Sequence, residues 1–147
     1  MKNHEEIFGI CEYVSIPELG INNVLAKIDT GAYSGALHCS RIKEVIRKSD
    51  GKKMLRFTPS DNHSHTMELS RYVRSYIRSS TGHHIRRYLF DTEVVIKGVS
   101  YCIRIGLSNR SDMNYEILIG RRFLSDNNIL VDARINQDLD IDREKKI

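Results

Sequence analysis

The 147-residue sequence has no long hydrophobic run. Its longest apolar stretches, at 117–119 and 129–131, are far shorter than the roughly 20 residues that cross a bilayer, so we expect no membrane-spanning helix. The first residues lack the apolar core of a signal peptide. The cysteines (Cys11, Cys39 and Cys102) are odd in number and widely spaced, which favours a reducing cytoplasm over a disulfide framework. We expect Cys39 and Cys102 to be small core residues.

The sequence also lacks the usual zinc-binding patterns. It has no His-Glu-x-x-His motif, and its cysteines do not have zinc-site spacing. His63, His65, His83 and His84 are an alternative metal cluster, but no cysteine or carboxylate is spaced to join them, and such histidines are more often solvated. We therefore predict no metal and no cofactor. We expect His38, which follows an apolar pair, to be a hydrogen-bonded buried histidine rather than a catalytic one.

Helical periodicity is scarce, and the patterns that are present favour strands. Hydrophobic residues make up 40% and charged residues 29% of the chain, which suits a single globular domain over residues 1–147. Short β-branched and aromatic runs separated by turn signals are typical of an all-β sandwich or barrel. The stretch 70–77 fits a helix or a strand, and we favour a strand. Predicted strands cover 7–14, 24–28, 34–39, 54–57, 92–96, 101–107, 116–119 and 129–132, with a hairpin turn at 97–98 and one short helix at 121–127.

Two separated segments indicate chemistry. A hydrophobic strand at 24–28 runs directly into the triplet Asp29-Thr30-Gly31, and a later hydrophobic strand at 117–119 ends in Gly120-Arg121. This layout resembles that of the retropepsins, aspartic peptidases built as a closed all-β barrel. The resemblance implies a retropepsin-like fold with one short C-terminal helix, in which Asp29 is the catalytic carboxylate.

The resemblance also implies roles for the neighbouring residues. In this family the second strand passes beside the aspartate loop, so Gly120 would leave room for a close backbone approach, while Ile119 and Arg121 would support the site. Gly31 would tolerate a tight conformation that strains a side chain. The Thr30 hydroxyl would join a hydrogen-bond network that crosses between two subunits.

One triplet per chain implies a symmetric homodimer. Two Asp29 carboxylates would then lie side by side and share one proton, because like charges so close cannot both ionise. The ionised carboxylate would take a proton from a water that attacks the amide carbonyl, and the protonated one would stabilise the oxyanion. Ala32 stands where many acidic-pH relatives carry a hydroxyl, which predicts a weakly acidic to neutral optimum.

A flap is expected between the two segments, over 78–84, with Gly82 at its tip. A retropepsin flap closes over the cleft and excludes water. We therefore predict substrate contacts from Ala32, Arg78, Gly82, His83, His84 and Arg86. An acidic peptide would suit these basic side chains.

A narrower resemblance covers about two thirds of the chain. Ala36-Leu37-His38 after the triplet, and 110–115 before the second segment, are similar to the bacterial and archaeal family labelled ATP-dependent zinc proteases, to which RimB-type proteins belong. This resemblance implies a link to ATP-grasp ligases that add glutamates to a ribosomal protein, and the trimming of such poly-glutamate tails. Residues about 40–75 are an insertion relative to a minimal retropepsin, and the sequence does not place them.

The net charge of +4 is unevenly spread, because 71–87 contains five arginines and no acidic residue. Such a stretch attracts anionic partners. The leading hypothesis is an aspartic peptidase acting on an acidic or glutamate-rich peptide. The alternatives are a non-catalytic dimer that clamps an extended peptide, and a ribosome- or RNA-associated adaptor that uses the basic stretch, although we regard nucleic acid as the less favoured partner.

Overall fold

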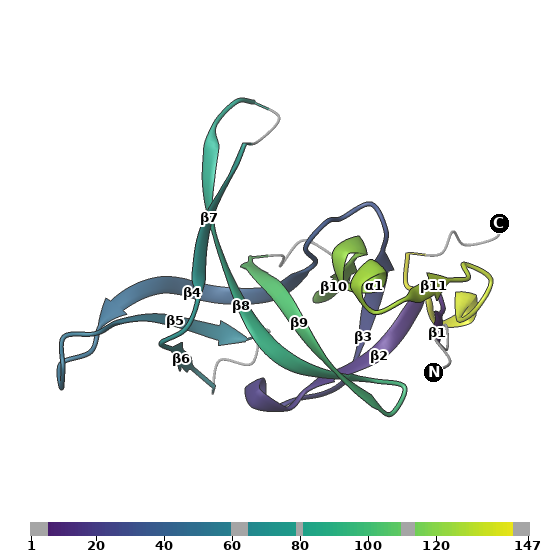
Figure 1. Ribbon diagram of the computed structural model, residues 1–147, viewed down its shortest axis with the longest axis horizontal. Helices are drawn as coiled ribbons and strands as arrows, with labels where there is room; N and C mark the ends of the chain where they lie inside the picture. Colours follow the sequence, from purple (N-terminus) through teal and green to yellow (C-terminus); the bar gives the residue numbers. More distant parts are fainter. Residues whose placement is uncertain (1–5, 60–64, 79–80, 110–113, 143–147) are drawn as a thin grey trace.

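The structure is a computed structural model that describes residues 6–59, 65–78, 81–109 and 114–142, apart from the side chains of residues 77 and 78. Figure 1 shows a barrel from which two hairpins stand out. The elements in chain order are β1 (Glu6–Phe8), β2 (Cys11–Ile16), the 3₁₀ turn η1 (Pro17–Leu19), β3 (Ile21–Asp29), β4 (Ala36–Ile46), β5 (Lys53–Pro59), β6 (Met67–Leu69), β7 (Val73–Arg78), β8 (His84–Ile96), β9 (Val99–Ser108), β10 (Ile117–Gly120), α1 (Arg121–Asp126), β11 (Ile129–Val131) and the 3₁₀ turn η2 (Gln137–Leu139).

Six strands close into a barrel in the order β10-β3-β2-β8-β9-β4, and β4 pairs with β10 to complete the ring. The predicted all-β closed barrel with one short C-terminal helix is confirmed. The stretch 70–77, which also fitted a helix, forms strand β7 over Val73–Arg78. Across the described ranges, no helix is both long enough and apolar enough to cross a membrane.

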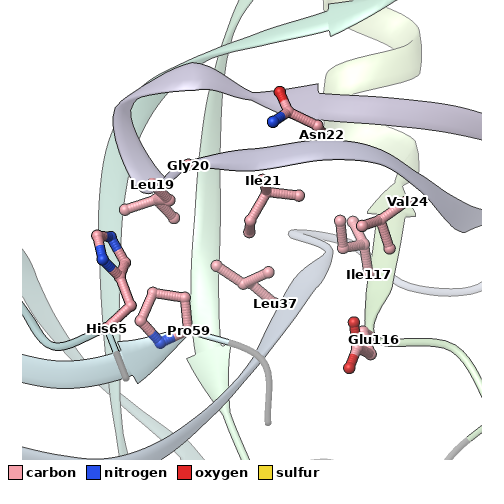
Figure 2. Close-up of a pocket in the computed structure, with 10 residues that line it drawn as sticks. All are labelled: Leu19, Gly20, Ile21, Asn22, Val24, Leu37, Pro59, His65, Glu116 and Ile117. Carbon is pink, nitrogen blue, oxygen red and sulfur yellow. The ribbon is translucent and has the colours of Figure 1, made fainter. Parts of the chain in front are cut away.

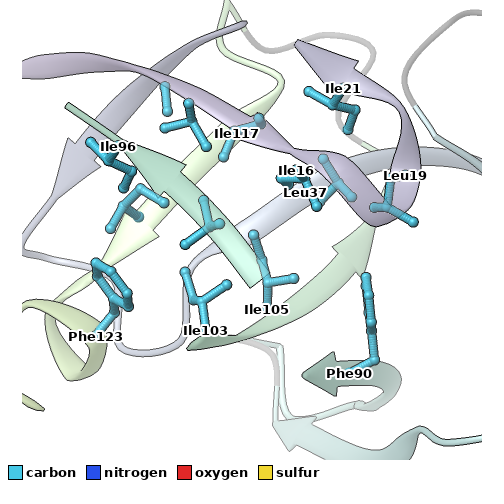
Figure 3. Packing of buried hydrophobic residues seen from close by; sticks show 14 of the residues in the cluster. Ile16, Leu19, Ile21, Leu37, Phe90, Ile96, Ile103, Ile105, Ile117 and Phe123 are labelled. Carbon is cyan, nitrogen blue, oxygen red and sulfur yellow. The ribbon is translucent and has the colours of Figure 1, made fainter. Parts of the chain in front are cut away.

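The barrel interior is filled by side chains from alternate strand positions (Figure 3). On β9, for example, Ile103 and Ile105 are 4% and 1% exposed, whereas Cys102 and Arg104, which alternate with them, face outward. The expectation that Cys102 is a core residue was therefore wrong, because it occupies an outward position of a strand whose neighbours point inward. Cys39 is buried as expected.

The β8–β9 hairpin explains why the predicted turn at 97–98 is correct. Lys97 and Gly98 have φ angles of 53° and 77°, so both central residues of this two-residue loop are left-handed. That combination belongs to a type I′ turn, whose twist matches the twist of the flanking strands. The hairpin holds two of the longest barrel strands in register, from Tyr88↔Leu107 to Ile96↔Val99.

The insertion at about 40–75 forms an arm beside the barrel. Strand β4 continues past the barrel to Ile46, pairs with β5, and β5 pairs in turn with β6. Its register shifts between Ser40 and Lys43, where Arg41 has a φ of 55°, which is the signature of a bulge that redirects the strand. In Figure 1 this arm extends away from the barrel at the left. We refer to β4 beyond Ser40, β5 and β6 as the arm.

Candidate active site

The Asp29 loop, residues 29–35, begins where β3 ends. Strand β10 lies between β3 and β4, parallel to β3 and antiparallel to β4, and its last residue Gly120 is opposite Asp29. The Asp29 carboxylate is half-buried and accepts a hydrogen bond from the Gly31 N–H at 3.0 Å. Thr30 and Gly31 are exposed in the single chain. The loop therefore presents a backbone-oriented carboxylate at the surface of one chain.

Residues that follow β10 donate hydrogen bonds to the backbone of this loop. The Arg121 backbone N–H donates to the Ala32 carbonyl at 2.8 Å, and the Arg122 N–H donates to the Tyr33 carbonyl at 3.1 Å. The Arg121 side chain donates through Nη1 to the Gly31 carbonyl at 3.0 Å. These bonds connect the start of α1 to three consecutive loop residues, so the second predicted segment lies directly beside the first.

Two glycines allow this close approach. A Cβ added to Gly120 would lie 2.5 Å from the Gly35 nitrogen and 2.6 Å from the Tyr33 oxygen, which leaves no room for a side chain. Gly35 has a φ of 64°, and its added Cβ would lie 2.5 Å from the Leu118 oxygen. Gly31 is not in the left-handed region, but an added Cβ there would lie only 3.2 Å from Asp29 Oδ1, so this position is also tight. The sequence analysis did not single out Gly35. Its position six residues after Asp29 becomes informative only once β10 is known to lie beside the loop.

A pocket of about 430 Å³ adjoins the loop. It is lined by Ala32, Tyr33, Ser34, Gly35, Ala36, Arg87 and Leu118. Ala32 was predicted to contact substrate, and the structure places it on this wall. Arg87 was not singled out from the sequence, where it is one of five arginines in the stretch 71–87. Its position depends on how β8 crosses the barrel, which no local pattern reports.

The predicted flap is the β7–β8 hairpin, which stands out from the barrel in Figure 1. Its strands pair from Val73↔Leu89 to Arg78↔His84, so Gly82, with a φ of 85°, lies in the connecting turn. His83 and His84 are exposed. The side chain of Arg78 lies outside the described part of the structure, so the contact predicted for it stays a prediction.

Arg86 belongs to a cluster of side chains between the flap hairpin and Glu44 of the arm. Its guanidinium lies 5.9 Å from the Tyr76 ring centroid and 3.8 Å from Glu44 Oε1. The Glu44 carboxylate, on the arm, also accepts hydrogen bonds from the hydroxyls of Tyr72 at 2.6 Å and Tyr88 at 3.1 Å. The Tyr72 bond lowers the pKa of Glu44, while burial and the Glu44 carboxylate raise the pKa of Tyr72 to about 12. One carboxylate therefore connects the arm to the flap hairpin.

The chain after β11 covers the strand pair β2–β3. Tyr115 donates a hydrogen bond to Asp140 Oδ1 at 2.5 Å, and Lys27 Nζ lies 3.3 Å from Asp140 Oδ2. Burial opposes ionisation of Asp140, but the Tyr115 hydroxyl, the Asp142 N–H and the Lys27 ammonium outweigh it, so the pKa of Asp140 is lowered. These contacts fasten the segment 136–142 to the strand that delivers Asp29.

The histidines do not assemble with other ligands in the described residues. No group of three His, Cys, Asp or Glu side chains with a geometry suited to a metal ion occurs among them, and His63 lies outside them. His38 is 2% exposed, in agreement with a buried role. Within the described ranges, a metal site built from the loop histidines therefore has no observation in its favour.

A separate pocket of about 290 Å³ lies around the start of β3 (Figure 2). Its lining is mixed: apolar side chains such as Leu19, Ile21 and Leu37 lie beside the polar side chains of Asn22, His65 and Glu116. None of the described residues that line it belongs to the Asp29 loop, and the one nearest to Asp29 along β3 and β10 is Ile117, which lies opposite Ala26, three residues or roughly 10 Å before Asp29. The pocket is therefore distinct from the Asp29 loop.

Comparisons with known proteins agree with this geometry. The family model RimB-like, described as retropepsin-like aspartic endopeptidase RimB, matches residues 7–137. The chain is similar to the probable alpha-L-glutamate ligases of Shewanella pealeana (28% identity over 135 residues, 90% of this chain and 29% of that protein) and Desulfotalea psychrophila (27% over 136 residues, 86% and 28%). It thus spans less than a third of the length of these curated relatives.

A solved structure extends the likeness to the whole fold. The crystal structure of a Legionella pneumophila protein with unknown function superposes with a TM-score of 0.69 at 27% identity, over 90% of this chain and 96% of that one. The segment matched by the family model contains the barrel, the Asp29 loop and the flap hairpin. The chain therefore belongs to the RimB-like family of retropepsin-like aspartic endopeptidases.

Proposed function

We propose that the protein is an aspartic endopeptidase that works as a homodimer and hydrolyses amide bonds in a glutamate-rich peptide. The observation that carries the proposal is the Asp29 loop: its carboxylate accepts the Gly31 N–H, its backbone is fixed by Arg121, and its outer residues are exposed in one chain. Such a carboxylate is oriented for chemistry, and the proposed mechanism needs a second acid beside it. A second copy of the chain, related by a two-fold axis, would supply one.

In the proposed dimer, the two Asp29 carboxylates share one proton because both cannot ionise at close range. The ionised member takes a proton from a water as that water attacks the peptide carbonyl. The protonated member hydrogen-bonds to the carbonyl oxygen and stabilises the negative charge that develops on it. The rigid loop matters because it holds both acids in place before the substrate arrives.

Charge distribution supports an acidic substrate. Residues 40–87, which include the arm and the outer part of the flap hairpin, contain twelve Lys and Arg but only four Asp and Glu, whereas the whole chain has a net charge of only +4. The remainder of the chain is therefore acidic. A basic surface on the arm and the flap hairpin would attract a poly-glutamate chain and repel a basic one. The similar proteins are named probable alpha-L-glutamate ligases, which suggests that a ligase of this kind makes the substrate.

The test is cleavage of a poly-glutamate peptide by the wild type and by Asp29→Asn. We expect cleavage to be lost in Asp29→Asn, while dimerisation, followed by sedimentation, is retained. Asp126→Asn is the matched control, because Asp126 is an exposed residue of α1 that pairs with Arg122. Equal activity in the Asp29 variant would refute the proposal.

Mixing the two proteins tests whether the dimer is the active unit. If both carboxylates are required, an equal mixture that exchanges subunits randomly keeps about a quarter of the wild-type activity, since only that share of dimers has two intact loops. A complete site within one chain would give about half. Tight peptide binding without cleavage would favour the clamp, and salt-sensitive RNA binding that ignores Asp29→Asn would favour the adaptor.

A further inference from the structure

Arg87 supplies a positive charge to the pocket beside the Asp29 loop. The other described residues that line this pocket of about 430 Å³ are uncharged: Ala32, Tyr33, Ser34, Gly35, Ala36 and Leu118. Arg87 comes from β8 of the flap hairpin, and its side chain is half-buried. The Arg87 guanidinium gives this side of the pocket N–H groups that can donate to an anionic group, and partial burial strengthens such a contact because water screens the charge less.

The pocket lies close to Asp29, because four of its lining residues, Ala32, Tyr33, Ser34 and Gly35, belong to the Asp29 loop. Leu118 lies opposite Lys27, and Gly120 lies opposite Asp29. Measured along the paired strands, Leu118 is therefore two residues away from Asp29. Side chains two residues apart on a strand point to the same face. The Leu118 wall is therefore roughly 7 Å along the strands from Asp29, which is one or two residues of an extended peptide.

The Arg87 guanidinium is held in place on two sides. Its Nη2 donates a hydrogen bond to the Gly35 carbonyl at 2.7 Å, within the Asp29 loop itself. On the other side it lies against Gly106 of β9, where an added Cβ would be in severe contact with Nε, 2.7 Å from Nη2 and 2.8 Å from Cζ. The absence of a side chain at Gly106 makes the space that the guanidinium fills. A fixed guanidinium loses little conformational freedom when it binds a ligand.

We propose that Arg87 is a specificity-determining residue that binds the carboxylate of a glutamate side chain one or two positions from the scissile bond, with Gly106 keeping the guanidinium in position. A guanidinium is planar, permanently charged and rich in donors, which matches a carboxylate better than any neutral group. A glutamine side chain would offer it only one uncharged acceptor oxygen. The proposal rests on the proposed function, because it names the subsite that selects an acidic peptide.

Binding can be measured without cleavage in the Asp29→Asn protein. Calorimetric titration would compare a poly-glutamate peptide, just long enough to fill the cleft so that it cannot shift register, with a series in which one glutamate at a time is replaced by glutamine. Because the proposed dimer has two copies of Arg87, we expect two positions, one on each side of the scissile bond, to weaken binding by roughly 10- to 100-fold each, the effect of losing a hydrogen-bonded charge pair. Adding Arg87→Met should weaken binding of the all-glutamate peptide by at least a similar factor and abolish the penalty at both positions.

Two further variants separate recognition from general damage. Gly106→Ala should move the guanidinium and reduce the glutamate preference, although it adds only one methyl group and removes no charge. Arg134→Met is the matched control, because Arg134 is exposed in the segment after β11 and pairs with Asp132. It should leave the preference unchanged.

The two proposals fail in different ways. A glutamine penalty of the same size before and after the Arg87→Met substitution, or a peptide series with no sensitive position, overturns the role of Arg87 even if the wild type cleaves the peptide. Absence of cleavage by the wild type, combined with an Arg87-dependent preference in the titrations, overturns the peptidase and leaves the subsite standing.

Discussion

The contact between Gly35 and β10 leads to a quantitative prediction about stability. Gly35 and Gly51 both have a φ angle in the left-handed region, 64° and 72°, but their surroundings differ. An added Cβ at Gly35 would lie 2.5 Å from the Leu118 oxygen and 3.0 Å from the Gly120 nitrogen, whereas nothing lies within 4 Å of one at Gly51. The pair therefore separates the cost of close packing from the cost of a left-handed backbone.

Alanine at either position should cost roughly 1–2 kcal/mol for the left-handed conformation. Gly35→Ala should cost roughly 1–3 kcal/mol more, because backbone atoms of β10 must move and overpacked sites lose stability on that scale. We thus expect Gly51→Ala to lower the free energy of unfolding by about 1–2 kcal/mol and Gly35→Ala by about 2–5 kcal/mol. Gly35→Ala should also reduce peptide cleavage, because the loop that carries Asp29 would be displaced.

Urea denaturation of the three proteins at one fixed concentration measures these differences. The concentration must be the same because a dimer gains stability by mass action. Similar m-values would show that the same surface is exposed on unfolding. Equal losses of stability for the two variants would refute the close approach of the Asp29 loop and β10.

Charges and hydrogen bonds lead to three further predictions. Glu44→Gln should lower the pKa of Tyr72 from about 12 toward its ordinary value, although burial still holds it above that value, and an ultraviolet titration of tyrosine ionisation measures the change. Asp140→Asn should cost roughly 1–2 kcal/mol at neutral pH, since it weakens charged hydrogen bonds that are partly exposed. Because the pKa of folded Asp140 is lowered, that contribution is complete above the ordinary carboxyl pKa and is lost as the pH falls through the folded value, so the urea midpoints of variant and wild type should converge in acid. Ala32→Ser should move the pH optimum of cleavage downward, because a hydroxyl beside the triplet can hydrogen-bond the charged form of the Asp29 pair, and an unchanged pH profile would contradict this.

Much of the fold could be predicted from local patterns. Alternating apolar positions identified most barrel strands, and glycine after Lys97 identified the β8–β9 turn, because a left-handed turn and a two-residue period are properties of short segments. Cys102 was misplaced for a related reason. Its assignment to the core rested on residue type, whereas the side of β9 on which it lies is set by the pairing register of the whole strand.

The candidate site, too, could be predicted only in part from the sequence. The triplet at Asp29 and the strand ending in Gly120 can be recognised in the sequence. In both cases a hydrophobic strand ends in a distinctive residue, Asp29 in one and Gly120 in the other. The sequence does not reveal that Gly35 touches β10, that Arg87 reaches the Asp29 loop across Gly106, or that Arg86 turns to Glu44.

Those contacts join residues far apart in the chain, and they depend on how six strands close into one ring. By itself, the sequence determined which segments are strands and which hydrophobic strand ends in a carboxylate, because both properties follow from side-chain type and local spacing. Only the tertiary structure decided which of many similar arginines lies beside that carboxylate, because barrel closure alone sets the distances between strands that are not neighbours in sequence.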